Sequence, residues 1–384
     1  MIKNIIKKIP LLRSSTKLLF DWHREMQQNK MIRKFLVQKA LPFSDKAPHY
    51  YVVGHEPTIR CNLKCKMCYQ GDTRTLRKEE LNTEQVLTIY KKLKDKTLSI
   101  KLVGGEPFMR SDIIDLIQFW DEAGKNIILQ TNCSLMTDAR INSLSKFKNI
   151  IDIATSLDGP PAIHDVIRGV PGTFNRSKNA ILSLRTHLPN VSISVFTVML
   201  VEDNLDYLNE LIDLCCELKI NSLQLLFEQF HIQGEIDETM SIFEQTFGWQ
   251  EHDYQLNTHI KDPAALQKID PGELKRKLHE IRSHGMKTGC YANYNPFIFY
   301  YNLPEYLSMN STKTFCLKLL KPELRINQRG DMIWCDIIEK SFGNLLEKTP
   351  DELWCSAEYQ AFRNYLFTDS FPVCKRCCKA ILIN

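Results

Sequence analysis

The stretch Arg60-Cys61-Asn62-Leu63-Lys64-Cys65-Lys66-Met67-Cys68-Tyr69 places three cysteines within eight residues, with the spacing C-x3-C-x2-C. Three thiolates on one short loop can bind three corners of a cubic iron-sulfur cluster, and the next cysteine in the chain is Cys133. Clusters held by four cysteines have no vacant iron and mostly transfer electrons. Structural zinc sites usually take their ligands as two separated pairs. The spacing therefore predicts a cluster with one iron open to another ligand.

The composition is that of a globular protein. The chain has 384 residues, 43% of them hydrophobic, which is enough to bury a large core. It has 13 cysteines, and the first 20 residues lack the cleavage pattern of a signal peptide. No apolar run approaches the roughly 18 to 20 residues needed to cross a bilayer. We therefore expect a cytoplasmic protein, whose cysteines bind metal rather than form disulfides.

The N-terminal segment, residues 1–48, is basic and carries the excess positive charge behind the net charge of +5. Its apolar residues recur at broadly helical intervals, which predicts one or two basic amphipathic helices. Such helices can rest on an anionic membrane surface, but packing on the protein's own body or on a partner is favoured. No arginine-rich cluster interleaved with aromatic residues is present, so nucleic-acid binding is not expected.

Strand and helix signals alternate about six times between residues 49 and 228. Aromatic and β-branched residues predict an interrupted strand over 50–59, and further strands over 99–103, 126–130, 150–155, 191–198 and 222–227. The helices between them include one over 83–94, capped by Thr83. Strands joined by helices form a parallel sheet with right-handed crossovers. We therefore predict an α/β fold, a partial (β/α)6 barrel over 49–228, with a lateral opening for a sizeable substrate.

Residues 229–315 lose this alternation and are predicted to form a mostly helical insertion or linker. Its clearest helix runs from Pro271 to Ser283, behind the cap Asp270. Aromatic residues gather between Tyr291 and Tyr306, and we interpret them as packing or a lid.

Residues 316–384 are predicted to form a small cluster-binding domain. Cys316 is followed after thirteen residues by Gly330, and Cys335 comes after four more. A C-x2-C pair, Cys374 and Cys377, lies near the end of the chain. These four cysteines suit a closed cluster or a zinc site. The stretch 327–330 predicts a hairpin that carries Cys335 back towards Cys316.

Together these motifs resemble a radical S-adenosylmethionine (radical SAM) enzyme with a C-terminal SPASM or twitch-type auxiliary-cluster domain. The C-x3-C-x2-C run, with Met67 before its third cysteine, fits the family's cluster motif. Gly104-Gly105-Glu106-Pro107, directly after the strand predicted at 99–103, fits the second family motif. The resemblance covers roughly residues 50–227 and 316–378.

The resemblance implies the chemistry. In similar enzymes, Cys61, Cys65 and Cys68 hold a [4Fe-4S] cluster, and the amino and carboxylate groups of SAM bind its open iron. An electron from the reduced cluster cleaves SAM, and a 5′-deoxyadenosyl radical then abstracts hydrogen from the substrate. Glu106 is expected to accept the SAM amine, with the glycines allowing close approach to the ligand. The expected SAM-contacting residues are Tyr69, Gly104, Gly105, Glu106, Pro107, Thr131, Asn132, Ser156 and Asp158.

Several of these assignments leave an alternative open. Thr131, Asn132, Ser156 and Asp158 follow predicted strands, where polar residues also serve as caps and turns. The segment 163–169 resembles SPASM-bearing enzymes too, but we interpret His164 as a surface histidine. No catalytic acid or base is assigned.

The C-terminal cysteines fit only the opening of the seven-cysteine SPASM motif, because the later cysteines are missing. The resemblance therefore implies one auxiliary [4Fe-4S] cluster rather than two. Its expected ligands are Cys316, Cys335, Cys374 and Cys377, with Cys378 or Cys355 as alternatives. The remaining cysteines, Cys133, Cys215, Cys216 and Cys290, are interpreted as buried thiols.

The resemblance implies an oxidoreductase whose auxiliary cluster assists electron transfer, with a reductant such as flavodoxin or ferredoxin. Substrates of similar enzymes include ribosomally made peptides and small sugar-like alcohols. The basic, helical N-terminal segment does not suggest a peptide-recognition wing, so a small polar, carbohydrate-type substrate is favoured over peptide maturation. An iron-sulfur sensor or scaffold is the alternative from another class, and it would not need Glu106 for the SAM amine.

Overall fold

The computed structural model describes residues 46–71, 79–309 and 313–382. The helices predicted from the basic N-terminal segment fall on residues 1–45, outside this part of the chain. Within the described ranges, no helix is both long enough and apolar enough to cross a membrane.

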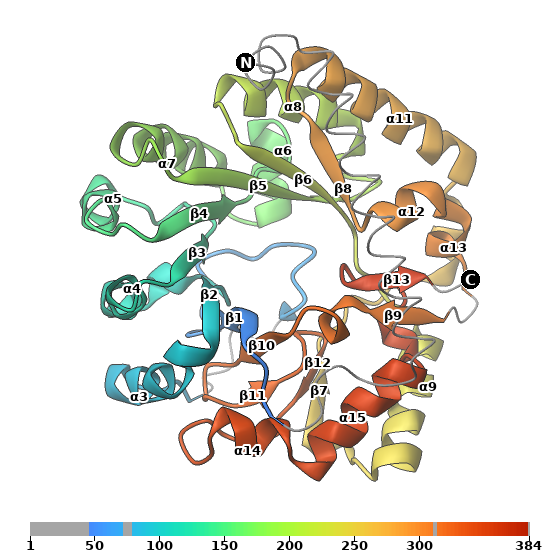
Figure 1. The fold of residues 1–384 in the computed structure, drawn as a ribbon. Helices are drawn as coiled ribbons and strands as arrows, with labels where there is room; N and C mark the ends of the chain where they lie inside the picture. The colour runs from blue at the N-terminus through green and yellow to red at the C-terminus, as the bar shows by residue number, and fades with distance from the viewer. Residues whose placement is uncertain (1–45, 72–78, 310–312, 383–384) are drawn as a thin grey trace, which may run out of the picture.

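A nine-stranded sheet with the order β11-β10-β1-β2-β3-β4-β5-β6-β8 organises the molecule. All pairs from β10 to β8 are parallel, and β11 is antiparallel to β10. Figure 1 shows these strands in an arc that does not close. The six central strands confirm the predicted βα pattern and the partial barrel. They are β1 (Tyr50–His55), β2 (Thr97–Leu102), β3 (Asn126–Gln130), β4 (Ile150–Thr155), β5 (Ser192–Met199) and β6 (Ser222–Phe227).

Helices cover the outside of the arc (Figure 1). They are α3 (Thr83–Leu93), α4 (Ile113–Glu122), α5 (Asp138–Leu144), α7 (Thr173–His187), α8 (Leu208–Glu217) and α11 (Pro271–Thr288). The predicted cap of α3 is off by one residue. The Asn82 side chain accepts from the backbone N–H of Gln85, while the Thr83 hydroxyl donates to Asp112 instead. Helix α11 starts behind Asp270 as predicted but runs five residues beyond Ser283.

Two segments outside the predicted barrel also supply strands to this sheet. Strand β8 (Ala292–Asn295) pairs with β6, and β10 (Glu323–Ile326) pairs with β1. Strand β8 and the short β7 (Tyr254–Leu256) were missed because each has only three or four residues, and two of those in β8 are asparagines, which strands disfavour. The domain boundaries therefore stay a prediction, since the sheet crosses them.

The other regular elements between residues 229 and 309 are mostly helical, as predicted. The elements are α9 (Gln233–Ile242), a π-helical turn (Phe243–Phe247), α10 (Pro263–Leu266), α12 (Phe297–Tyr301) and α13 (Leu303–Leu307). The aromatic residues of this segment pack on one another and on the sheet. Tyr294 stacks on Tyr300 with ring centroids 5.0 Å apart, and Tyr306 lies 5.2 Å from Phe227 of β6.

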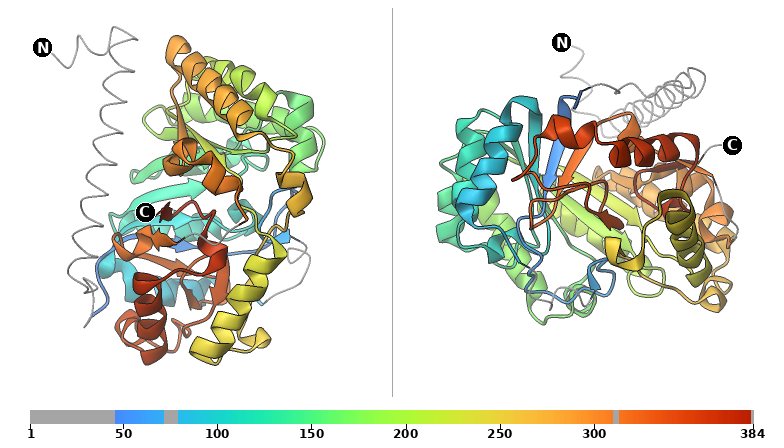
Figure 2. Two further views of the ribbon diagram at one scale, coloured as in Figure 1. Left: turned by 90° about the vertical axis from the view of Figure 1, so that its right-hand side faces the viewer. Right: turned by 90° about the horizontal axis from the view of Figure 1, so that it is seen from below.

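The C-terminal elements lie beside α9 in both views of Figure 2. They are β9 (Thr314–Cys316), β11 (Met332–Ile333), β12 (Ile338–Lys340), α14 (Pro350–Trp354), α15 (Ala357–Thr368) and β13 (Ala380–Leu382). Strands β10 and β11 form the predicted hairpin. Strand β13 pairs with β9 within this region, and β12 pairs with β7 of the preceding insertion.

The loop with the three cysteines follows β1 and lies inside the arc (Figure 1). The glycine pair after β2 holds it there. The N–H of Gly105 donates to the Thr58 carbonyl (3.0 Å), and the N–H of Glu106 donates to the Arg60 carbonyl (2.8 Å). Gly104 has a φ of +130°, which favours glycine. We expected these glycines to allow close approach to a ligand, but their observed close contacts are with the chain's own backbone at residues 58–60.

Gly105→Ala should destabilise the protein, because the added Cβ would overlap the carbonyl oxygens of Ile59 and Arg60. Overpacking of this kind typically costs about 1–3 kcal/mol. We expect the free energy of unfolding of the cluster-free protein, measured with urea, to fall by that amount. Gly234→Ala in α9 is the control, since its Cβ would meet nothing within 4 Å. Identical unfolding curves for G105A and the parent would contradict this packing.

Candidate functional site

Cys61, Cys65 and Cys68 are partly exposed on the loop after β1 and form no disulfide. The loop is tied to the end of α6 (Pro161–Arg168), because the N–H groups of Lys64 and Lys66 donate to carbonyls of that helix. Burial raises the pKa of the Cys61 thiol to about 11. Three thiols on one supported loop fit the predicted cluster with one open iron.

Glu106 is buried, with 1% of its surface exposed, at the C-terminal end of β2. Its carboxylate accepts from the Thr131 hydroxyl (2.7 Å), the Asn132 N–H (2.7 Å) and the Phe108 N–H (3.2 Å). Burial raises the pKa of Glu106 to about 6, although these hydrogen bonds favour the ionised form. The structure thus brings together three residues that the sequence placed separately, at the ends of β2 and β3.

Asn132 also connects this carboxylate to the cysteine loop. Its side-chain amide donates to Asn62 (2.9 Å), and the Asn62 amide donates to the Ser134 hydroxyl (2.8 Å). Sequence reasoning missed Asn62, although its position directly after Cys61 indicates a residue close to the cluster site. The loop and the polar strand ends therefore form one hydrogen-bonded unit.

Asp158 is fully buried, and its two carboxylate oxygens accept from Arg168 at 2.6 and 2.8 Å. Burial opposes ionisation, but the Arg168 guanidinium holds the pKa of Asp158 below its ordinary value. The same guanidinium donates to the Cys65 sulfur at 3.6 Å. The observed contact of Asp158 is thus with a residue that supports the cysteine loop. Its SAM contact stays a prediction, as does that of Ser156, which is half-buried after β4.

Two interpretations of single residues are wrong. His164 is not on the surface, because its side chain is 1% exposed and its ring contacts Phe174 and Asp158. It is buried because it shares the inward face of α6 with Ile167, three residues on. Cys216 is exposed, since α8 turns its neighbour Cys215 inward instead. Cys133, Cys215 and Cys290 are buried as predicted.

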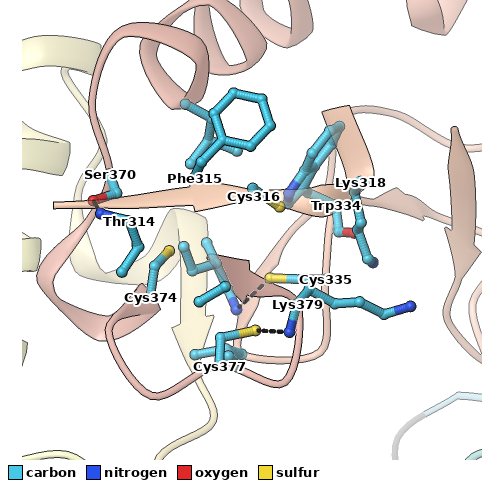
Figure 3. A pocket seen from close by; sticks show the side chains of 14 residues that line it. Thr314, Phe315, Cys316, Lys318, Trp334, Cys335, Ser370, Cys374, Cys377 and Lys379 are labelled. Carbon is cyan, nitrogen blue, oxygen red and sulfur yellow. Dashed lines mark hydrogen bonds between the residues drawn. The ribbon is translucent and has the colours of Figure 1, made fainter. Parts of the chain in front are cut away.

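The four predicted auxiliary ligands surround one cavity of about 40 Å³ (Figure 3). Cys316 ends β9, Cys335 follows β11, and Cys374 and Cys377 precede β13. Backbone N–H groups of Ile338 and Lys379 donate to the sulfurs of Cys335 and Cys377. The alternatives Cys378 and Cys355 do not line this cavity. The predicted set of four is therefore the one that the fold gathers.

Within the described residues, no three His, Cys, Asp or Glu side chains lie close enough to share one metal ion. The four cysteines line a mostly apolar cavity, and four thiolates around one cavity can bind the four corners of a [4Fe-4S] cluster.

Four side chains connect the two cysteine sites. Tyr69, directly after Cys68, donates to Glu56 (3.1 Å), and Arg325 of β10 donates to Glu56 (2.7 Å) and to Asp336, directly after Cys335. Burial, together with the Asp336 charge, raises the pKa of Glu56 to about 7. Sequence reasoning missed Glu56 and Arg325, because only the pairing of β1 with β10 brings them together. The Tyr69 hydroxyl is engaged here, and its SAM contact stays a prediction.

Sequence profiles of known families match both parts of this arrangement. The radical SAM superfamily profile matches residues 55–215, and the profile of the SPASM iron-sulfur cluster-binding domain matches residues 316–378. The chain belongs to the radical SAM superfamily and carries a C-terminal SPASM domain. It is an enzyme, and its cofactors are [4Fe-4S] clusters and SAM.

Relatives and solved structures agree with this assignment. The AdoMet-dependent heme synthase of Nitratidesulfovibrio vulgaris is 27% identical, over 84% of this chain and 82% of that protein. The PqqA peptide cyclase of Rhizobium meliloti is 24% identical, over 84% of this chain and 78% of that protein. The structure of Streptococcus suis SuiB bound to precursor peptide SuiA matches with a TM-score of 0.60 and 17% identity, over 89% of this chain and 72% of that one. This last likeness shows the fold.

Glu106→Gln should weaken SAM binding, because glutamine offers one acceptor oxygen where Glu106 offers two. A hydrogen bond to a charged group is worth about 1.5–3 kcal/mol, so we expect a loss of roughly 10- to 100-fold in affinity. Equilibrium dialysis of SAM against anaerobically loaded protein measures this. Glu122→Gln, on the exposed surface of α4, is the matched control. Equal affinities for E106Q and the parent would rule out the expected role.

The pH dependence of SAM affinity should report the same carboxylate. Ionised Glu106 is the better acceptor, so affinity should rise as the pH passes about 6 and then level off. Because the folded pKa is raised, ionisation costs folding stability, which should fall as the pH rises from the ordinary glutamate range through about 6. Dialysis between pH 5.5 and 8 tests the first effect. A flat profile for the parent would contradict it.

Proposed function

We propose that this chain is a radical SAM oxidoreductase that modifies a peptide, and that one auxiliary cluster takes up the electron released from the substrate. The observation that carries this proposal is the pairing of β1 with β10. Strand β1 leads into the loop with Cys61, and the β10-β11 hairpin leads to Cys335. Two cysteine sites on neighbouring strands suit a reaction that starts at one and delivers an electron to the other.

The residues present fit these cofactors. Cys61, Cys65 and Cys68 would hold the first cluster and leave one iron for SAM. When bound, SAM and this cluster supply a 5′-deoxyadenosyl radical that removes a hydrogen atom from the substrate. Glu106 would accept a hydrogen bond from the amino group of SAM, while Thr131 and Asn132 hold the Glu106 carboxylate in place. The auxiliary ligands would be Cys316, Cys335, Cys374 and Cys377, and a flavodoxin- or ferredoxin-type protein would supply electrons.

The peptide substrate rests on the relatives. The PqqA peptide cyclase aligns with 84% of this chain. The heme synthase relative, also aligned over 84% of the chain, favours a tetrapyrrole as the second candidate. The comparisons give no support to the carbohydrate-type substrate that the sequence analysis favoured.

Anaerobic reconstitution should give about eight irons per chain, as two four-iron clusters. A Cys335→Ser, Cys377→Ser variant should keep about four irons and still form 5′-deoxyadenosine, because its SAM-binding cysteines are intact. Iron analysis and mass spectrometry measure both quantities, and Cys216→Ser, at an exposed thiol, should behave as the parent. About four irons in the parent would refute the auxiliary cluster, and no SAM cleavage by fully loaded protein would refute the enzyme class.

A further inference from the structure

Lys101 lies near the C-terminal end of β2 and points to the inner side of the arc. Its neighbours Ile100 and Leu102 are fully buried in the hydrophobic core. Successive side chains of a strand point to opposite faces. Lys101 therefore points away from this core, towards the side where Figure 1 shows the cysteine loop.

The sheet register sets Lys101 in a row with charged residues of other strands. Lys101 is aligned with Gly54 of β1, and Gly54 with Arg325 of β10. The Arg325 side chain lies across Gly54, because a Cβ at that glycine would overlap the guanidinium. In the other direction the row passes Ile128 of β3 to Asp152 of β4. Gly54 thus makes room for the Arg325 side chain on the face where Lys101 also lies.

The two neighbouring cations of this face are neutralised. Arg325 lies 2.7 Å from Glu56 and also pairs with Asp336, and Lys379 lies 2.7 Å from Glu323. Lys101 has no hydrogen bond and no ion pair with any residue that the structure describes. Asp152 is the nearest carboxylate along the row, but its side chain accepts from the Ser194 hydroxyl (2.9 Å).

The unpaired ammonium group is held in an unfavourable environment. Burial lowers the pKa of Lys101 to about 8, and the charges of Arg325 and Lys379 add to this effect, while Asp336 opposes it. The exposed thiol of Cys378 also lies within its electrostatic reach. The charge of Asp152 also acts on Lys101 without forming an ion pair. A lysine that has no direct partner among the described residues is suited to binding an anion from outside.

We propose that Lys101 binds a carboxylate group of the substrate. This inference rests on the proposed function in taking the inner face of the sheet as the substrate side. The carboxylate can come from a peptide, as a side chain or a C-terminus, or from a propionate of a tetrapyrrole. Lys101 lies on β2, and the turn that follows this strand carries Glu106, so a carboxylate held by Lys101 would be anchored on the strand that leads to the expected SAM site.

Two matched pairs of probes separate the sources of the carboxylate. The peptide pair is Ac-Ala-Glu-Ala-NH2 and Ac-Ala-Gln-Ala-NH2. The tetrapyrrole pair is coproporphyrin III and its tetramethyl ester. Equilibrium dialysis against anaerobically loaded protein should show one acidic probe binding about 10- to 100-fold more tightly than its neutral partner. Which pair shows the difference identifies the source.

Lys101→Gln should abolish this difference, and Lys101→Arg should retain most of it. Lys146→Gln, at an exposed position outside the arc, is the control. Circular dichroism establishes folding, and Lys101→Arg keeps the test valid if Lys101→Gln does not fold. The proposal is overturned if neither pair of probes discriminates by charge in the parent. It is also overturned if a folded K101Q still discriminates, or if K101R no longer does. Failure of the parent to cleave SAM would instead refute the proposed function.

Discussion

The cysteine loop is held over the sheet by backbone hydrogen bonds to Gly105 and Glu106. This contact requires glycine, because the carbonyl oxygens of Ile59 and Arg60 occupy the space of a side chain at position 105. The same short stretch then places Glu106 against the end of β3. One close approach of two backbone segments thus fixes the position of the three cysteines relative to the carboxylate that we assign to SAM.

The second constraint is the compensation of buried charge. Glu56 and Asp336 neutralise Arg325, and Asp158 neutralises Arg168. Breaking a buried pair leaves an uncompensated charge and typically costs about 3–5 kcal/mol. These pairs also help to position the cysteine sites, because each connects one of the sites to a distant strand or helix. Against this background, Lys101 stands out, because it has no hydrogen bond or ion pair with any of the residues that the structure describes.

The sequence was sufficient for the features that depend on local pattern. The six central strands and the helix behind Asp270 follow from periodicity and capping, which act over a few residues. Spacing and resemblance also selected the four C-terminal cysteines that the structure places around one cavity, and their role as cluster ligands stays a prediction. What was missed depends on contacts between distant segments. Strand β10 needs β1 beside it, and the link from Tyr69 to Asp336 needs both Glu56 and Arg325.

The central claim is that the loop at Cys61 holds the cluster that SAM binds, and that the C-terminal cysteines hold a closed one. Electron paramagnetic resonance of reduced, fully loaded protein, recorded before and after addition of SAM, tests this most directly. The account predicts that SAM changes the signal of one four-iron cluster and leaves the other unchanged. It also predicts that the SAM-sensitive signal is absent when Cys61, Cys65 and Cys68 are replaced by alanine. A SAM-induced change that persists in that variant, or no change in the parent, would contradict it.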